Sequence, residues 1–115
     1  MIISKNINVT TTDVTELLQI PNGYIGNCSM IFVCNLTDTD NTVSITIGKG
    51  EDPDSNIFLE QPLTSKEQLS FPPNEGGLLV LLPEQTLEAQ LGSVGNVEFI
   101  VTLDVVYSPF SFNNM

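Results

Sequence analysis

The feature of this sequence that most limits its fold is a two-residue alternation near its end. Every second position of the segment 97–107 is apolar: Val97, Phe99, Val101, Leu103, Val105 and Tyr107. Successive side chains of an extended strand point to opposite faces, so this pattern predicts one long strand with a buried face. A helix would need apolar residues every three or four positions, and no segment of the chain shows that period convincingly.

The alternation recurs in shorter segments that turn-forming residues separate. It is clear at 43–47 and 87–91, while the segment 24–36 is apolar on both faces, which predicts a central or covered strand. Weaker candidate strands lie at 7–10, 14–20, 57–60, 68–71 and 78–82. Clusters of Gly, Pro, Asp and Asn lie between most of them. The sequence therefore predicts an all-β fold, a single antiparallel β-sandwich (jelly-roll or immunoglobulin-like) of about seven to nine strands.

The chain has 115 residues, which fits one domain. We expect the sandwich to occupy residues 1–115, with a short N-terminal arm at 1–6 and a C-terminal tail at 108–115. Pro109 is expected to end the last strand, because proline cannot donate to a sheet. The apolar run at the start is too short for a cleavable signal, and no run reaches the roughly 20 residues of a membrane helix. We therefore expect synthesis and release in the cytoplasm.

The charge of the chain excludes several classes of function. There are 14 acidic residues, three lysines, no arginine and no histidine, for a net charge of −11. Without histidine the chain cannot build a Ser-His-Asp triad or a His-ligated metal site, so we expect no enzyme, no cofactor and no metal. Three lysines cannot neutralise a phosphate backbone or hold an anionic bilayer, so we expect neither nucleic acid nor membrane as a partner.

The two cysteines, Cys28 and Cys34, are expected to be free thiols. Six residues of a strand separate them by roughly 20 Å. A disulfide needs Cα atoms within about 7 Å of each other. They are therefore predicted to pack as small apolar side chains.

Two acidic loops offer oxygen ligands, at Asp38-Thr39-Asp40-Asn41 and at 51–54. An EF-type calcium loop that began at Asp38 would need Gly and Glu where this chain has Val43 and Lys49, so the motif fails. Turn hydrogen bonds are the favoured role of these side chains. A carbohydrate- or calcium-binding recognition module remains an alternative, although the chain has no tryptophan on which a sugar could stack.

Apolar side chains at both ends and on the central strand are the candidate contact residues. Phe110 and Phe112 lie two apart in an extended tail, so their rings share a face. They either fold back on their own core or anchor in a neighbouring subunit, because exposed aromatic residues are unfavourable in water. The first residues present the same choice, and the second face of 24–36 also needs a cover. The candidate assembly contacts are Ile2, Ile3, Ile31, Val33, Phe110 and Phe112.

One further pattern is a resemblance. The stretch Leu17-Leu18-Gln19-Ile20-Pro21-Asn22-Gly23-Tyr24, followed by Met30-Ile31-Phe32-Val33-Cys34-Asn35, resembles the opening of small β-sandwich virion structural proteins of tailed bacteriophages. In that group a strand ends in Val-Pro-x-Gly and the next carries apolar-x-Val-x-Asn. The segments 43–48, 78–91 and 97–107 continue the match. The turn before Thr86 is commonly Gly-Asp in that group, but it is Glu84-Gln85 here.

The resemblance implies a non-enzymatic structural role in a phage particle, with no catalytic motif to carry over. The leading hypothesis is a capsid decoration or cement protein that binds the outer shell as a homo-oligomer and stabilises it. The alternative within the particle is a tail, neck or baseplate component. The implied partners are other virion proteins, either the major capsid protein or tail and neck proteins. The implied location is the virion, after synthesis in the host cytoplasm.

Overall fold

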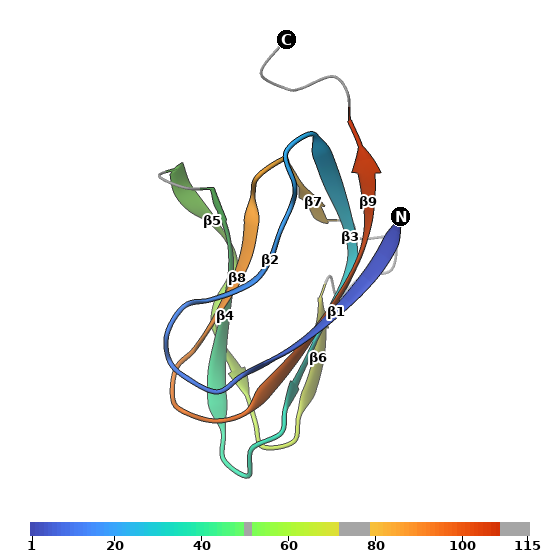
Figure 1. Ribbon diagram of the computed structural model, residues 1–115. Coiled ribbons are helices and arrows are strands. Elements are labelled where there is room, and N and C mark those ends of the chain that lie inside the picture. Colours follow the sequence, from blue (N-terminus) through green and yellow to red (C-terminus); the bar gives the residue numbers. More distant parts are fainter. Residues whose placement is uncertain (50–51, 72–78, 109–115) are drawn as a thin grey trace.

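The computed structural model describes residues 1–49, 52–71 and 79–108. The described chain consists of strands joined by turns and loops, which confirms the all-β class (Figure 1). The strands are β1 (Ile2–Val9), β2 (Thr15–Gln19), β3 (Tyr24–Asn35), β4 (Asn41–Lys49), β5 (Asp52–Leu63), β6 (Gln68–Phe71), β7 (Leu79–Leu81), β8 (Thr86–Leu91) and β9 (Val97–Tyr107).

These strands form two antiparallel sheets. Sheet A has the order β1-β9-β3-β6, with β7 also paired to β3, and sheet B has the order β2-β8-β4-β5. Because β6 and β7 pair with different halves of β3, they share one strand position, and each sheet has four positions. The chain changes sheet at most of its connections, and among the described strands only β4 and β5 are consecutive and paired. Of the two sandwich types expected, this order is that of a jelly roll.

The core lies between the two sheets, which face each other in Figure 1. The alternation read from the sequence supplies it: the apolar set of β9 from Val97 to Leu103 is buried, and Phe99 is fully enclosed. Sheet B contributes the matching set of β4 and β8. Its buried members are Val43, Ile45, Ile47, Leu87, Ala89 and Leu91.

Two strands have the predicted bounds, five have ends within two residues of the prediction, and β1 and β5 differ by more. β6 and β9 have the predicted bounds, and β3 ends one residue earlier than predicted. The arm expected at residues 1–6 is instead part of β1, which pairs with β9 along its whole length, from Ile2 opposite Asp104 to Val9 opposite Val97. β5 is longer than the four residues predicted. The N–H of Ser108 donates to the carbonyl of Gly23 at 2.8 Å, and the rest of the tail lies outside the described residues.

Gly26 lets the core close at one point of β3. A Cβ atom there would lie 2.6 Å from Cδ1 of Ile20 and 3.0 Å from Cδ1 of Leu103. The first distance is shorter than van der Waals contact allows, so a larger residue would force Ile20 to move. The glycine is therefore explained by packing, with no need for an unusual backbone angle.

Candidate assembly surfaces

A β-bulge in β3 decides which of its side chains face the core. Its pairing with β9 runs regularly to Cys28 opposite Leu103 and resumes at Met30 opposite Thr102, so Ser29 is an extra residue. One inserted residue reverses the alternation that follows it. Cys28 before the bulge and Ile31 after it therefore face the same way, into the core.

The expectation that Ile31 and Val33 lie on the outward face of β3 is wrong. Both side chains are fully buried between the sheets. An unbroken alternation would have kept them opposite Cys28, but the bulge turns them inward and turns Met30 and Phe32 outward. β3 therefore does have a second apolar face, but Met30 and Phe32 form it in place of Ile31 and Val33.

A group of apolar side chains lies on the outer surface of sheet A, among polar residues such as Asn27, Ser70 and Thr102. The register places Phe32 opposite Ile100 and Ile25 opposite Val106, with Met30 on the same side of β3. Met30 is 38%, Val80 45% and Val106 39% exposed, and the others are half-buried against their neighbours. We call this surface the sheet A face, with apolar members Ile2, Ile25, Met30, Phe32, Val80, Ile100 and Val106.

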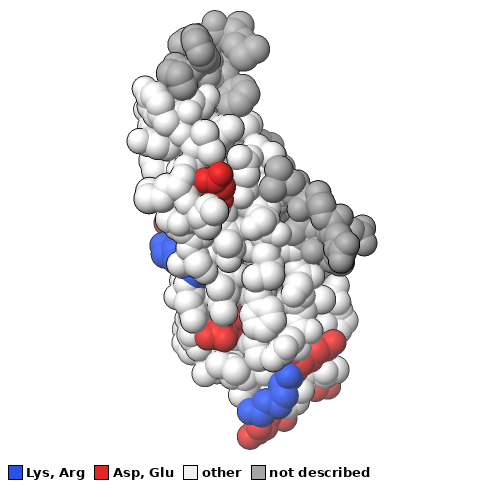
Figure 2. Space-filling model, turned by 90° about the vertical axis from the view of Figure 1, so that its right-hand side faces the viewer, with Lys and Arg blue, Asp and Glu red and all other residues white. Residues whose placement is uncertain are grey.

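The sheet A face carries little charge. Among its described positions the register includes two acidic side chains, Glu98 and Asp104, and both have partners within the chain. Oε2 of Glu98 accepts from Nδ2 of Asn6 at 3.1 Å, and Oδ1 of Asp104 lies 2.9 Å from the amino group of Met1. Figure 2 shows this side of the molecule mostly white, with two separate red patches, a blue group at its left edge, and red and blue together at its lower end. The face is thus nearly uncharged in a chain of net charge −11.

The outer surface of sheet B is different in kind. Its central strands β4 and β8 present hydroxyl, amide and carboxylate groups, because the apolar side chains of both strands point into the core. The outward side chains are Thr42, Ser44, Thr46, Thr86, Glu88 and Gln90. The outer face of sheet A therefore carries an apolar cluster that the outward positions of β4 and β8 lack.

A shallow polar pocket of about 360 Å³ lies on this sheet B surface. Its lining includes hydroxyl groups of Thr42 and Ser44, the amide of Gln90 and the carboxylate of Glu60. The backbone N–H of Glu60 donates to Oγ of Ser44 at 2.9 Å, so that hydroxyl is already engaged. The described lining contains no aromatic ring, and aromatic stacking is what the carbohydrate alternative would require.

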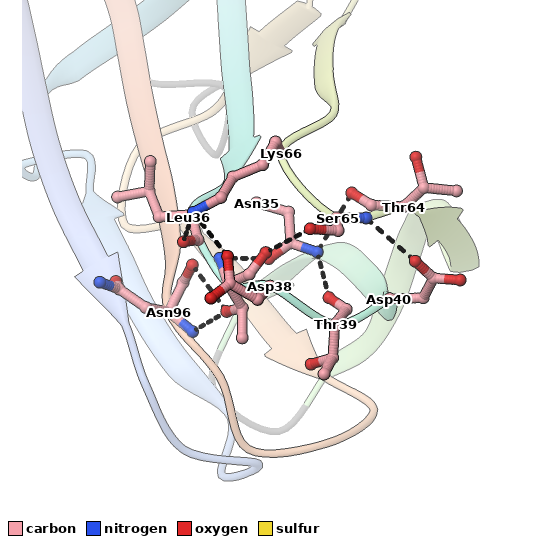
Figure 3. A network of polar contacts seen from close by, with 10 residues as sticks. Asn35, Leu36, Asp38, Thr39, Asp40, Thr64, Ser65, Lys66 and Asn96 are labelled. Atoms are coloured by element: carbon pink, nitrogen blue, oxygen red, sulfur yellow. Dashed lines mark hydrogen bonds and ion pairs between the residues drawn. The ribbon is translucent and has the colours of Figure 1, made fainter.

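A polar network at the lower end of the sandwich holds three loops together (Figure 3). Its centre is Asn35, a fully buried side chain at the end of β3. Its Nδ2 donates to the carbonyls of Thr39, Leu63 and Thr64 at 2.9, 3.1 and 3.2 Å, and its Oδ1 accepts from the N–H of Thr37 at 3.0 Å. Oγ1 of Thr37 in turn accepts from the N–H of Asn96 at 2.7 Å. The network therefore ties the β3–β4, β5–β6 and β8–β9 loops to one strand end.

The acidic residues of the first candidate metal loop bind groups of the same network. Asp38 forms an ion pair with Lys66 at 3.2 Å, and Oδ1 of Asp40 accepts from the N–H of Ser65 at 3.0 Å. Oδ1 of Asn41 accepts from the N–H of Thr42 and of Ser93. Apart from the Asn41–Thr42 bond, these contacts join residues of different loops, so they differ from the local turn hydrogen bonds expected from the sequence. The described residues contain no cluster of three or more His, Cys, Asp or Glu side chains that could hold a metal ion.

Both cysteines are free and buried, as expected. Burial raises the pKa of the Cys28 thiol, so the neutral form is favoured further. Its Sγ lies 3.7 Å from the carbonyl oxygen of Met30, next to the bulge. A protonated, enclosed thiol behaves as a packing group and is a poor nucleophile.

The remaining predicted contact residues divide into two groups. Ile2 is 76% exposed and lies on the sheet A face. Ile3 is 37% exposed and lies on the other face of β1, where its register partner on β9 is Leu103. Phe110 and Phe112 lie outside the described residues. The outward apolar positions that the sequence analysis missed include Ile100 and Val106. The sequence did contain a signal for these two residues, because they are apolar at alternate positions of 97–107 where the other residues are polar.

Comparison with known proteins shows a likeness of fold. No family model matches the sequence, and no curated protein matches it. Among solved structures, a chain from the acidic stable capsid structure of Helicobacter pylori bacteriophage KHP30 is similar, with a TM-score of 0.57 and 12% sequence identity. The match covers 95% of this chain and 89% of that chain. At that identity the likeness establishes a shared sandwich fold.

The described part of the chain contains no helix long and apolar enough to cross a membrane.

Proposed function

We propose that this protein is a non-enzymatic structural component of a bacteriophage virion, and specifically a capsid decoration or cement protein that binds the outer shell as a homo-oligomer. The observation that carries the proposal is the correspondence of fold with a chain of a phage capsid structure, over 95% of one chain and 89% of the other. Because nearly all of both chains is matched, the neighbour is also a small protein of similar length. The sequence resemblance to small phage β-sandwich proteins agrees with it.

The mechanism of such a protein is mass action. A protein that binds the assembled shell, and not the dissociated subunits, shifts the equilibrium towards the shell, by about 2.7 kcal/mol per site at a free concentration of 100 times the Kd. The net charge of −11 favours solubility of the free protein before it binds. The nearly uncharged sheet A face provides apolar surface that such an assembly would bury.

Co-sedimentation with purified particles tests the proposal. The purified protein is mixed with empty capsids of the phage that encodes it and, separately, with isolated tails, and each mixture is pelleted. We expect the protein to pellet with capsids at a saturating ratio and to raise their melting temperature. Binding to tails but not to capsids would contradict decoration and favour the tail, neck or baseplate alternative.

A further inference from the structure

We infer that the sheet A face is the surface through which two copies of this chain associate. The inference rests on the homo-oligomer of the proposed function and deepens it by naming the interface. Sheet B and the loops are then left free for other partners.

The first argument is the contrast between the two outer faces. A sandwich that is solvated on both sides should have polar residues on both, as sheet B does. Sheet A has polar residues on its outer face too, but it also places Met30, Phe32 and Ile100 side by side on its central strands β3 and β9, at positions that point away from the core. An apolar cluster of this kind on an outward face favours cover by another molecule.

The second argument is charge, and it selects the occupant. A strongly basic partner would be attracted to the acidic loops and to sheet B, and it would gain little from a nearly uncharged face. A second copy carries the same net charge of −11, so it is repelled from every acidic surface. The sheet A face offers the approach with the fewest like charges, and its two acids, Glu98 and Asp104, are already partnered within the chain.

The third argument is size. Four strand positions, with a longest strand of 12 residues (β3), cover at most on the order of 750 Å² of flat surface at ordinary strand spacing. A standard stable interface buries about 800 Å² on each partner. A two-fold contact uses the same patch on both copies, so this one face could supply both sides of such an interface.

The substitution Met30→Glu tests the inference. Met30 is 38% exposed at the centre of the face, so glutamate can reach water in a monomer and the fold should persist. In an association across this face two such carboxylates would be buried without partners. We expect wild-type protein to have the molar mass of an oligomer by light scattering. We expect Met30→Glu to weaken the association by about 100-fold or more.

The matched control is Gln90→Glu on the outer surface of sheet B. It adds the same single negative charge at an exposed position. We expect its molar mass to equal that of the wild type across the same dilution series, and thermal melting establishes that both variants fold. Wild-type protein that is monomeric at every concentration, a Met30→Glu variant that remains oligomeric, or equal dissociation of both variants would overturn the inference.

The capsid experiment separates this inference from the proposed function. A monomeric wild type that still pellets with capsids would overturn the interface and leave decoration standing. An oligomer that Met30→Glu dissociates but that binds no capsid would support the interface and contradict decoration.

Discussion

Replacing Asn35 by alanine is expected to lower the free energy of unfolding by about 3–5 kcal/mol, because several buried polar groups lose their partner at once. The side chain makes four hydrogen bonds to backbone groups of residues 37, 39, 63 and 64. Alanine can replace none of them, and the enclosed site limits the access of water. Equilibrium denaturation in urea measures the change.

The control for this prediction is Asn8→Ala on β1. Asn8 is exposed, and its Nδ2 makes one hydrogen bond, to Oδ1 of Asn96 at 2.9 Å. Its loss is expected to change the free energy of unfolding by no more than about 0.5 kcal/mol. If Asn35→Ala proved as mild as Asn8→Ala, the loop network would not be holding the lower end of the sandwich together.

Replacing Phe99 by alanine is the second change with a large expected effect, a loss of about 3–5 kcal/mol. Phe99 is fully buried in the middle of sheet A, between Ile7 on β1 and Val33 on β3 in the register. Removing the ring forfeits its burial and leaves a cavity that two opposed sheets cannot close. Thermal and denaturant unfolding should both show the loss.

Val106→Ala is the matched control on the same strand. Val106 points outward and is 39% exposed, so its truncation in the monomer is expected to cost about 0.5 kcal/mol or less. Measured on diluted, monomeric protein, the pair tests the orientation of β9. Equal losses at both positions would mean that the inward and outward faces of the strand have been assigned wrongly.

The fold could be predicted from the sequence where the hydrophobic pattern is regular. The alternation at 97–107 gave the bounds of β9, and the shorter alternation of polar and apolar residues at 68–71 gave β6. β1 was harder to predict because most of its residues are polar or exposed. It is an edge strand that pairs with β9 alone, so it needs little apolar surface. The sheet order depends on contacts between distant segments, which no local pattern records.

The candidate surface was predictable only in part. The sequence showed that β3 is apolar on both faces, but the bulge at Ser29 exchanges the faces of every residue after it. A bulge of this kind adds one residue and leaves no distinct sequence signal, so Ile31 and Val33 were assigned outward. Asn35 was also missed, because an asparagine at the end of a strand normally suggests a turn, and its burial depends on loops some 30 residues away.

The central claim is that this protein decorates a phage capsid, and the copy number in purified particles tests it most directly. Quantitative mass spectrometry of intact virions, scaled to the major capsid protein, gives that number. Decoration of a shell built from many equivalent sites predicts on the order of hundreds of copies per particle. A count of about six or twelve, as in a single ring at a neck or baseplate, would contradict the account.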